Sequence, residues 1–215
     1  EGVKLLNGSL DFTVSGVDAT EITNLNIDEV RFGTATTMAA TVETRTSAQL
    51  GTLSHTGNLT ADTTLEIAGN KGVEGFTFHS NATMTEIASA VNQATDVTGV
   101  RASATGPATV NFLSTEYGSK QFVSVESLAG DSFDTAEGAT SKRLDRGRDA
   151  VVMVNGVTAV ADGLDIEING PTFAFQGSLD STNMNTAGAS STFRVTGGGT
   201  QLQLGPEVNA QQMSI

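Results

Sequence analysis

The side chains that could do chemistry are few and lie far apart along the chain. The sequence has two histidines, His55 and His79, and no cysteine. Neither histidine lies in a His-Glu-x-x-His segment, the helical spacing that brings two imidazoles to one zinc ion. No Gly-x-Ser-x-Gly turn presents a serine nucleophile, and the glycines at 197–199 are not followed by the Lys-Ser/Thr of a phosphate-binding loop. The sequence therefore predicts no enzyme and no cofactor.

Carboxylates are the one plentiful reactive group. Some pair of them must fall within the ~5–10 Å that separates the two acids of a glycosidase, but the aromatic side chains that hold a sugar ring are scarce, at 5% of residues. Asp162, Asp165 and Glu167 are candidate calcium ligands. Because no Asp-x-Asp-x-Asp-Gly loop is present, we interpret them as a solvated acidic rim and expect no metal site.

Charge also limits the partners. The chain carries 24 acidic and 11 basic residues, a formal net charge of −13, which repels nucleic acid and anionic membrane surfaces. No apolar run approaches the ~20 residues that cross a bilayer. We expect no nucleic acid and no membrane partner.

The elements that must carry these residues are mostly short strands. The chain has 24 glycines and few aromatic side chains, and apolar and polar residues alternate along many short segments, a pattern typical of β-strands joined by turns. The fold class that we predict is mainly β with one short helix, an α+β arrangement in which the outer domains are inserted into a β-hairpin root.

The helix is predicted inside residues 65–104, where the hydrophobic period changes twice. Residues 73–78 alternate as a half-buried strand, with Val73, Phe76 and Phe78 set against Glu74 and Thr77. The apolar positions then follow helical spacing, and residues 96–99 break the helix before alternation resumes at 100–104. The apolar positions of the helix are Met84, Ile87, Ala88, Val91 and Ala94.

The start of the helix is marked by its own side chains. Thr83 and Glu86 have the spacing of a capping box, in which the hydroxyl accepts from the amide three residues on while the carboxylate accepts from the cap amide. The unit is therefore predicted to run strand, turn, strand, helix, strand.

This unit resembles the hook IN motif of bacterial flagellins and filament-cap proteins. The residues that carry the resemblance, with a structural role only, are Thr83, Glu86, Ile87, Val91, Asn92, Gly99 and Val100. Residues 1–9 are similar to the segment that follows the long N-terminal helices of flagellin, and residues 202–215 to the closing hairpin of its core domain, with Gly-Pro-Glu at 205–207 in place of Gly-Ala-Asn. The polymerising helices of flagellin have no counterpart, so the chain resembles a fragment without them.

The resemblance implies a division of the chain. Residues 1–37 and 192–215 are expected to be root strands next to the filament core, with the chain ends close together. Residues 38–130 are expected to form the hook-motif domain. Residues 131–191 form a second β-rich outer segment, and the polar stretch 130–149 is the longest candidate loop and a domain boundary.

Two functions from different classes follow from the resemblance. The first is a structural protein, the outer domains of a flagellin subunit in the extracellular filament used for swimming, with other flagellin subunits as partners of the whole protein and the fragment itself a monomer. The alternative is a filament-cap or adhesin-like module that binds mucin, glycan or a host surface. The closing hairpin at 202–215 distinguishes them, because cap proteins lack it.

Overall fold

The protein folds into two compact units, each with a core of its own. The computed structural model describes residues 12–197, 201–203 and 212–214. Unit 1 comprises residues 1–46, 151–160 and 165–215, and unit 2 comprises residues 47–150 and 161–164. Unit 2 is therefore an insertion into unit 1. Residues 135–136 and 144–146 pair with strands of unit 2, so the segment 131–150 belongs to that unit.

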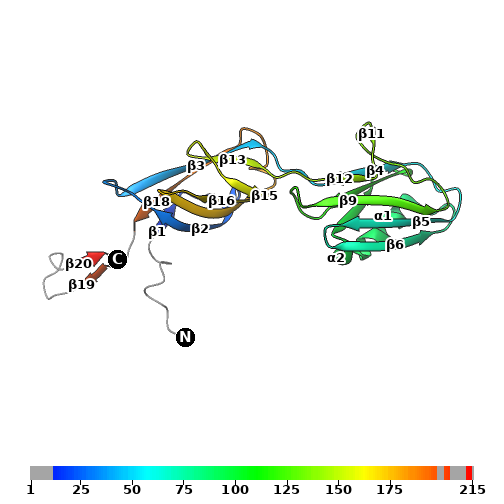
Figure 1. The fold of residues 1–215 in the computed structure, drawn as a ribbon, viewed down its shortest axis with the longest axis horizontal. Coiled ribbons are helices and arrows are strands. Elements are labelled where there is room, and N and C mark those ends of the chain that lie inside the picture. Colours follow the sequence, from blue (N-terminus) through cyan, green and yellow to red (C-terminus); the bar gives the residue numbers. More distant parts are fainter. Residues whose placement is uncertain (1–11, 198–200, 204–211, 215) are drawn as a thin grey trace. The chain divides into compact units, whose positions relative to one another are not determined.

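Unit 1 is built from two antiparallel sheets (Figure 1). The five-stranded sheet has the order β1-β18-β3-β13-β14, and the four-stranded sheet has the order β15-β16-β17-β2. Phe175 of β17 meets Phe193 of β18 edge to face, with ring centroids 5.9 Å apart, so the core lies between the sheets. The strands are β1 (Phe12–Ser15), β2 (Ile22–Val30), β3 (Thr37–Thr46), β13 (Val151–Val154), β14 (Val157–Thr158), β15 (Val160–Asp162), β16 (Asp165–Asn169), β17 (Phe173–Leu179) and β18 (Ser190–Gly197).

The chain enters and leaves unit 1 on neighbouring strands. β1, near the start of the chain, pairs antiparallel with β18, and Phe12 lies opposite Gly197 (blue and orange in Figure 1). The chain ends themselves, which are expected to lie close together, are outside the described residues. The segment 1–9, on which part of the family resemblance depends, lies outside the described residues.

A separate two-stranded sheet follows near the end of the chain. β19 (Gln201–Gln203) pairs antiparallel with β20 (Gln212–Ser214), and Leu202 lies opposite Met213. The hairpin expected at 202–215 is therefore present at these strands, and the turn at 205–207 lies outside the described residues.

Unit 2 is a β-sandwich with helices at one edge. One sheet has the order β11-β10-β4-β8-β7 and the other β12-β9-β5-β6. The core takes Leu53 and Phe112 from the first sheet and Leu65, Ile67 and Val123 from the second, all fully buried. The elements are β4 (Thr52–Thr56), β5 (Thr63–Gly69), β6 (Gly72–Phe78), α1 (Met84–Gln93), α2 (Thr95–Thr98), β7 (Val100–Ala104), β8 (Thr109–Ser114), β9 (Phe122–Ala129), β10 (Thr135–Glu137), β11 (Thr140–Ser141) and β12 (Leu144–Arg146).

Three predictions for unit 2 are wrong in instructive ways. Residues 96–99 do not simply break the helix, because residues 95–98 form α2 before Gly99 ends it. Val73 is 53% exposed, since on β6 it points to the opposite face from Phe76 and Phe78. The stretch 130–149 is not a loop: β10 pairs with β4, and β12 pairs with β9. Backbone pairing does not require apolar side chains, so the polar sequence of this stretch did not reveal its strands.

Candidate functional site

The site singled out by the sequence is the helical edge of unit 2, which contains the residues that resemble the hook IN motif. The capping box is confirmed: Glu86 N–H donates to Thr83 Oγ1 at 3.2 Å, and Thr83 N–H donates to the Glu86 carboxylate at 2.7 Å. The hydrogen bonds from the Thr83 backbone amide and hydroxyl hold the pKa of the Glu86 carboxyl below its usual value. The carboxylate therefore stays ionised, and the helix start stays fixed, at neutral pH.

The apolar stripe of α1 faces the core as predicted. Met84, Ile87, Ala88 and Val91 are all buried, and Val100 of β7 joins the same cluster. The helix contacts β7 and β8 of the five-stranded sheet. Ile87, Val91 and Val100 are therefore part of the packed core of unit 2.

Asn92 completes the hydrogen bonding of an edge strand. β7 is the last strand of its sheet, with β8 as its one neighbouring strand. The Asn92 amide accepts from Ala102 N–H and donates to Ala102 C=O, both at 2.8 Å. One carboxamide thus supplies the acceptor and the donor that a further strand would have supplied.

Two threonines that sequence reasoning missed extend this arrangement. Thr95 Oγ1 donates to Val100 C=O at 3.0 Å, and Val100 N–H donates to Thr98 Oγ1 at 3.1 Å. Side chains from α1 and α2 therefore satisfy the outward-facing backbone groups of Val100 and Ala102. An edge strand closed in this way does not offer those positions to another chain. Threonine is too common in this sequence for its position alone to have signalled this role.

Gly99 turns the chain from α2 into β7. Its φ of +75° lies in the left-handed region, where it ends α2, and its N–H donates to Thr95 C=O at 2.8 Å. A β-carbon at this position would lie 2.3 Å from Asn70 Oδ1. Backbone conformation and space both favour glycine here.

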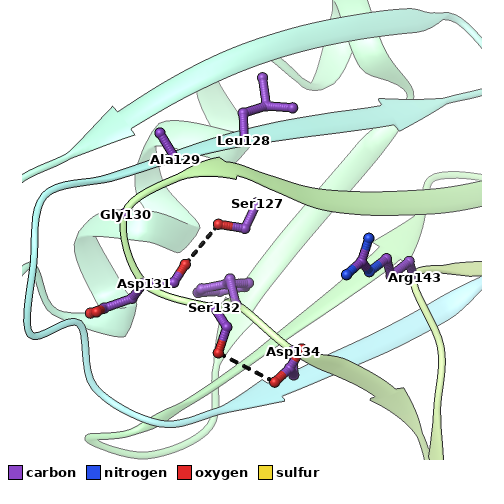
Figure 2. A pocket seen from close by; sticks show the side chains of 9 residues that line it. Ser127, Leu128, Ala129, Gly130, Asp131, Ser132, Asp134 and Arg143 are labelled. Carbon is purple, nitrogen blue, oxygen red and sulfur yellow. Dashed lines mark hydrogen bonds between the residues drawn. The ribbon is translucent and has the colours of Figure 1, made fainter.

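A hollow of about 240 Å³ in unit 2 lies at the end of β9 (Figure 2). Its polar groups are largely engaged with the protein: Ser127 Oγ donates to Asp131 C=O at 2.7 Å, and Ser132 Oγ lies 3.4 Å from Asp134 Oδ2. The Asp131 carboxylate accepts from the Thr60 and Ala61 amides, which lowers the pKa of its carboxyl. These contacts fasten the turn to its neighbours and do not form a nucleophile–base pair.

The histidine and acidic side chains considered as candidate ligands in the sequence are not brought together by the fold of the described residues. In the described residues, no group of three or more His, Asp or Glu side chains is placed to share a metal ion. Of the two histidines, His55 is buried in unit 2 and His79 is exposed at the end of β6. Asp165 accepts a hydrogen bond from Ser178 Oγ at 2.6 Å within the unit 1 sheet. Over the part of the chain that is described, no helix is both long and apolar enough to cross a bilayer.

Comparison with known proteins finds a family match within unit 2 and solved structures of similar fold. Residues 64–115 match the family described as the flagellin hook IN motif. Comparison of the sequence with curated proteins gives no match. The D2-D3 domains of the flagellar cap protein FliD from Escherichia coli are 20% identical, with a TM-score of 0.57 over 87% of this chain and 98% of that chain.

Two further cap-protein structures are similar to the chain. FliD D2-D3 domains from Serratia marcescens are 18% identical with a TM-score of 0.50, over 80% of this chain and 97% of that one. FliD from Pseudomonas aeruginosa is 13% identical with a TM-score of 0.50, over 85% and 84% of the two chains. Residues 64–115 of unit 2 thus match the flagellin hook IN motif, and the mainly β fold of the chain is similar to that of the E. coli FliD D2-D3 domains.

Proposed function

We propose that this chain forms the outer domains of a flagellar cap protein, at the extracellular tip of the filament. The observation that carries the proposal is the likeness to the E. coli FliD D2-D3 pair, which includes nearly all of that chain and both units of this one. The hook IN match at 64–115 supports a flagellar role independently of the fold comparison.

The proposed work of these domains is mechanical. In each of the two units, the sheets enclose a separate apolar core, and the chain enters and leaves unit 1 on the paired strands β1 and β18. We infer that residues 1–37 and 192–215 contain the root that joins unit 1 to a filament-core domain. Because Phe12 lies opposite Gly197, both connections leave this antiparallel strand pair at the same end.

A flagellin subunit is the second candidate, and one observation favours it. The antiparallel pairing of β19 with β20 places a hairpin where the sequence resembles the closing hairpin of flagellin. In that case the outer domains would lie along the whole filament, with other flagellin subunits as neighbours.

Immunogold electron microscopy on intact cells distinguishes the two. An antibody raised against the 215-residue chain is expected to label the filament tip alone if the protein is a cap, and the whole filament if it is a flagellin. A strain lacking the gene is the matched control. Absence of label from the flagellum in the parent strain, with the protein detected elsewhere, would reject both functions.

A further inference from the structure

The imidazole of His55 is buried where residues 130–148, which we call the arm, cross β4. His55 is 6% exposed and stacks on Phe133 of the arm, with ring centroids 3.6 Å apart and an interplanar angle of 17°. Phe133 is itself 3% exposed and meets the ring of Phe112 on β8 edge to face. His55 therefore holds the aromatic anchor of the arm against the core.

The same ring is hydrogen-bonded to the arm backbone. His55 Nδ1 lies 2.8 Å from Asp134 C=O. A carbonyl can only accept, so Nδ1 carries the proton in the neutral ring and a second proton must go to Nε2. Nε2 lies on the side of Gly57, where a β-carbon would come within 3.2 Å. Protonation thus places a charge on a ring packed between an aromatic side chain and the backbone.

The arm is attached to β4 over a short distance. Strand pairing there consists of Thr135 with His55 and Ala136 with Ser54, and Ser54 Oγ donates to Ala136 C=O at 3.2 Å. The two ends of the arm have separate attachments: the Asp131 carboxylate binds the Thr60 and Ala61 amides, and β12 pairs with β9. Only the middle of the arm depends on the His55 contacts.

The pKa of the His55 imidazole decides how acidification acts on the arm. Burial lowers the pKa of His55 from its ordinary value of about 6.5, and this outweighs the hydrogen bond to the Asp134 carbonyl and the charge of Asp134, which favour the imidazolium. The nearest β8 and β10 residues, including Val110 and Thr135, are uncharged, and Glu137 is paired with Lys142. A released His55 binds protons more readily than the packed one, so acidification below about pH 6.5 favours release.

We propose that His55 is an acid-sensitive latch, whose protonation releases the middle of the arm from β4 and uncovers Phe133. The proposal concerns unit 2 alone and does not depend on whether the protein is a cap or a flagellin. The stacking, the buried ring and the short strand pairing are the features that couple one proton to this movement.

Amide hydrogen exchange read by mass spectrometry tests the latch on the whole 215-residue chain. After correction for intrinsic exchange rates, peptides covering residues 132–137 are expected to lose protection several-fold between pH 7.5 and pH 5.0. Peptides from β5 and β9 are expected to keep their protection. Equal protection of the arm at both pH values would overturn the proposal.

Two variants and one spectrum separate the histidines. His55→Phe keeps a stacking ring without a titrating nitrogen. In this variant, the protection of peptides covering residues 132–137 is expected to be the same at pH 7.5 and pH 5.0. His79→Gln, at the exposed histidine, is expected to leave the pH dependence unchanged; loss of the dependence in this variant would overturn the assignment. If His55→Phe fails to fold, ring proton shifts in the wild-type protein decide, because a His55 pKa at or above the ordinary imidazole value of about 6.5 contradicts the latch.

Discussion

At the scale of single residues, the structure explains why a carboxamide occupies position 92. Ala102 presents its N–H and C=O on the outer edge of β7, where no further strand pairs with them, and Asn92 bonds to both at 2.8 Å. Alanine can satisfy neither group, and aspartate can satisfy only the N–H. Leaving a partly buried backbone group without a partner costs about 1–3 kcal/mol. Ala102 itself is 7% exposed, so solvent has little access to replace the lost bonds.

Substitution of Asn92 is therefore expected to destabilise unit 2. Asn92→Ala should lower its free energy of unfolding by about 1–3 kcal/mol. Asn92→Asp should be at least as harmful at neutral pH, because it sets a carboxylate against the Ala102 carbonyl. Urea titration followed by circular dichroism measures both. Gln93→Ala, at the next and also exposed position, is the matched control and should change little; equal effects at 92 and 93 would contradict this role for Asn92.

Residues of this edge were predictable only where their type is restrictive. The capping box could be predicted from Thr83 and Glu86 because few pairs have that spacing and chemistry. Asn92 and Gly99 were found through the family resemblance. Thr95 and Thr98 were not, because a hydroxyl that bonds to a strand edge is indistinguishable in sequence from one that faces water.

At the scale of elements, α1 is too short to be stable by itself and depends on side-chain contacts. The helix has ten residues, which is short for a helix to be stable by itself in water. Its position depends on the buried stripe and on the box formed by Thr83 and Glu86. The box accounts for two backbone amides that would otherwise have no intrahelical partner.

Thr83→Ala is expected to lower the stability of unit 2 by about 1 kcal/mol, because the Glu86 amide loses its acceptor. Hydrogen exchange in the first turn of α1 should increase more than exchange at its end. Thr85→Ala, at an exposed threonine two residues further on, serves as the control, and matching losses from the two substitutions would show that the cap has no special role.

Strands were predicted well where apolar and polar side chains alternate, and poorly where only backbone pairing defines the strand. Ile166 and Ile168 face inward on β16 as their spacing predicts. The segment 176–192 is rich in Ser, Thr, Asn and Gly, a composition typical of a loop, yet β17 continues to Leu179 and β18 begins at Ser190. Likewise, β8 and β9 are joined by a short glycine-containing link typical of a hairpin, but they lie in different sheets of unit 2. Local pattern carries no information about which strand lies next to which.

At the scale of the whole molecule, the nested connectivity determines how stability is distributed. The chain passes between units at residues 46/47, 150/151, 160/161 and 164/165, but each unit buries its own aromatic centre. Phe112 lies at the centre of unit 2 and Phe175 at that of unit 1, and both are fully buried. Separate cores favour separate unfolding, since cooperative regions tend to follow contiguous packing.

Paired core substitutions test this separation. Phe112→Ala and Phe175→Ala each remove a ring from one core and should each cost about 3–5 kcal/mol in their own unit. Hydrogen exchange measured over a series of denaturant concentrations should show unfolding at lower denaturant for peptides of β5 and β9 in the first variant, and of β2 and β17 in the second. The two variants control for each other, because they remove the same side chain from equally buried sites. If each substitution lowers protection in both units to the same extent, the two cores unfold as one, and the insertion of unit 2 into unit 1 then couples them more strongly than their separate packing suggests.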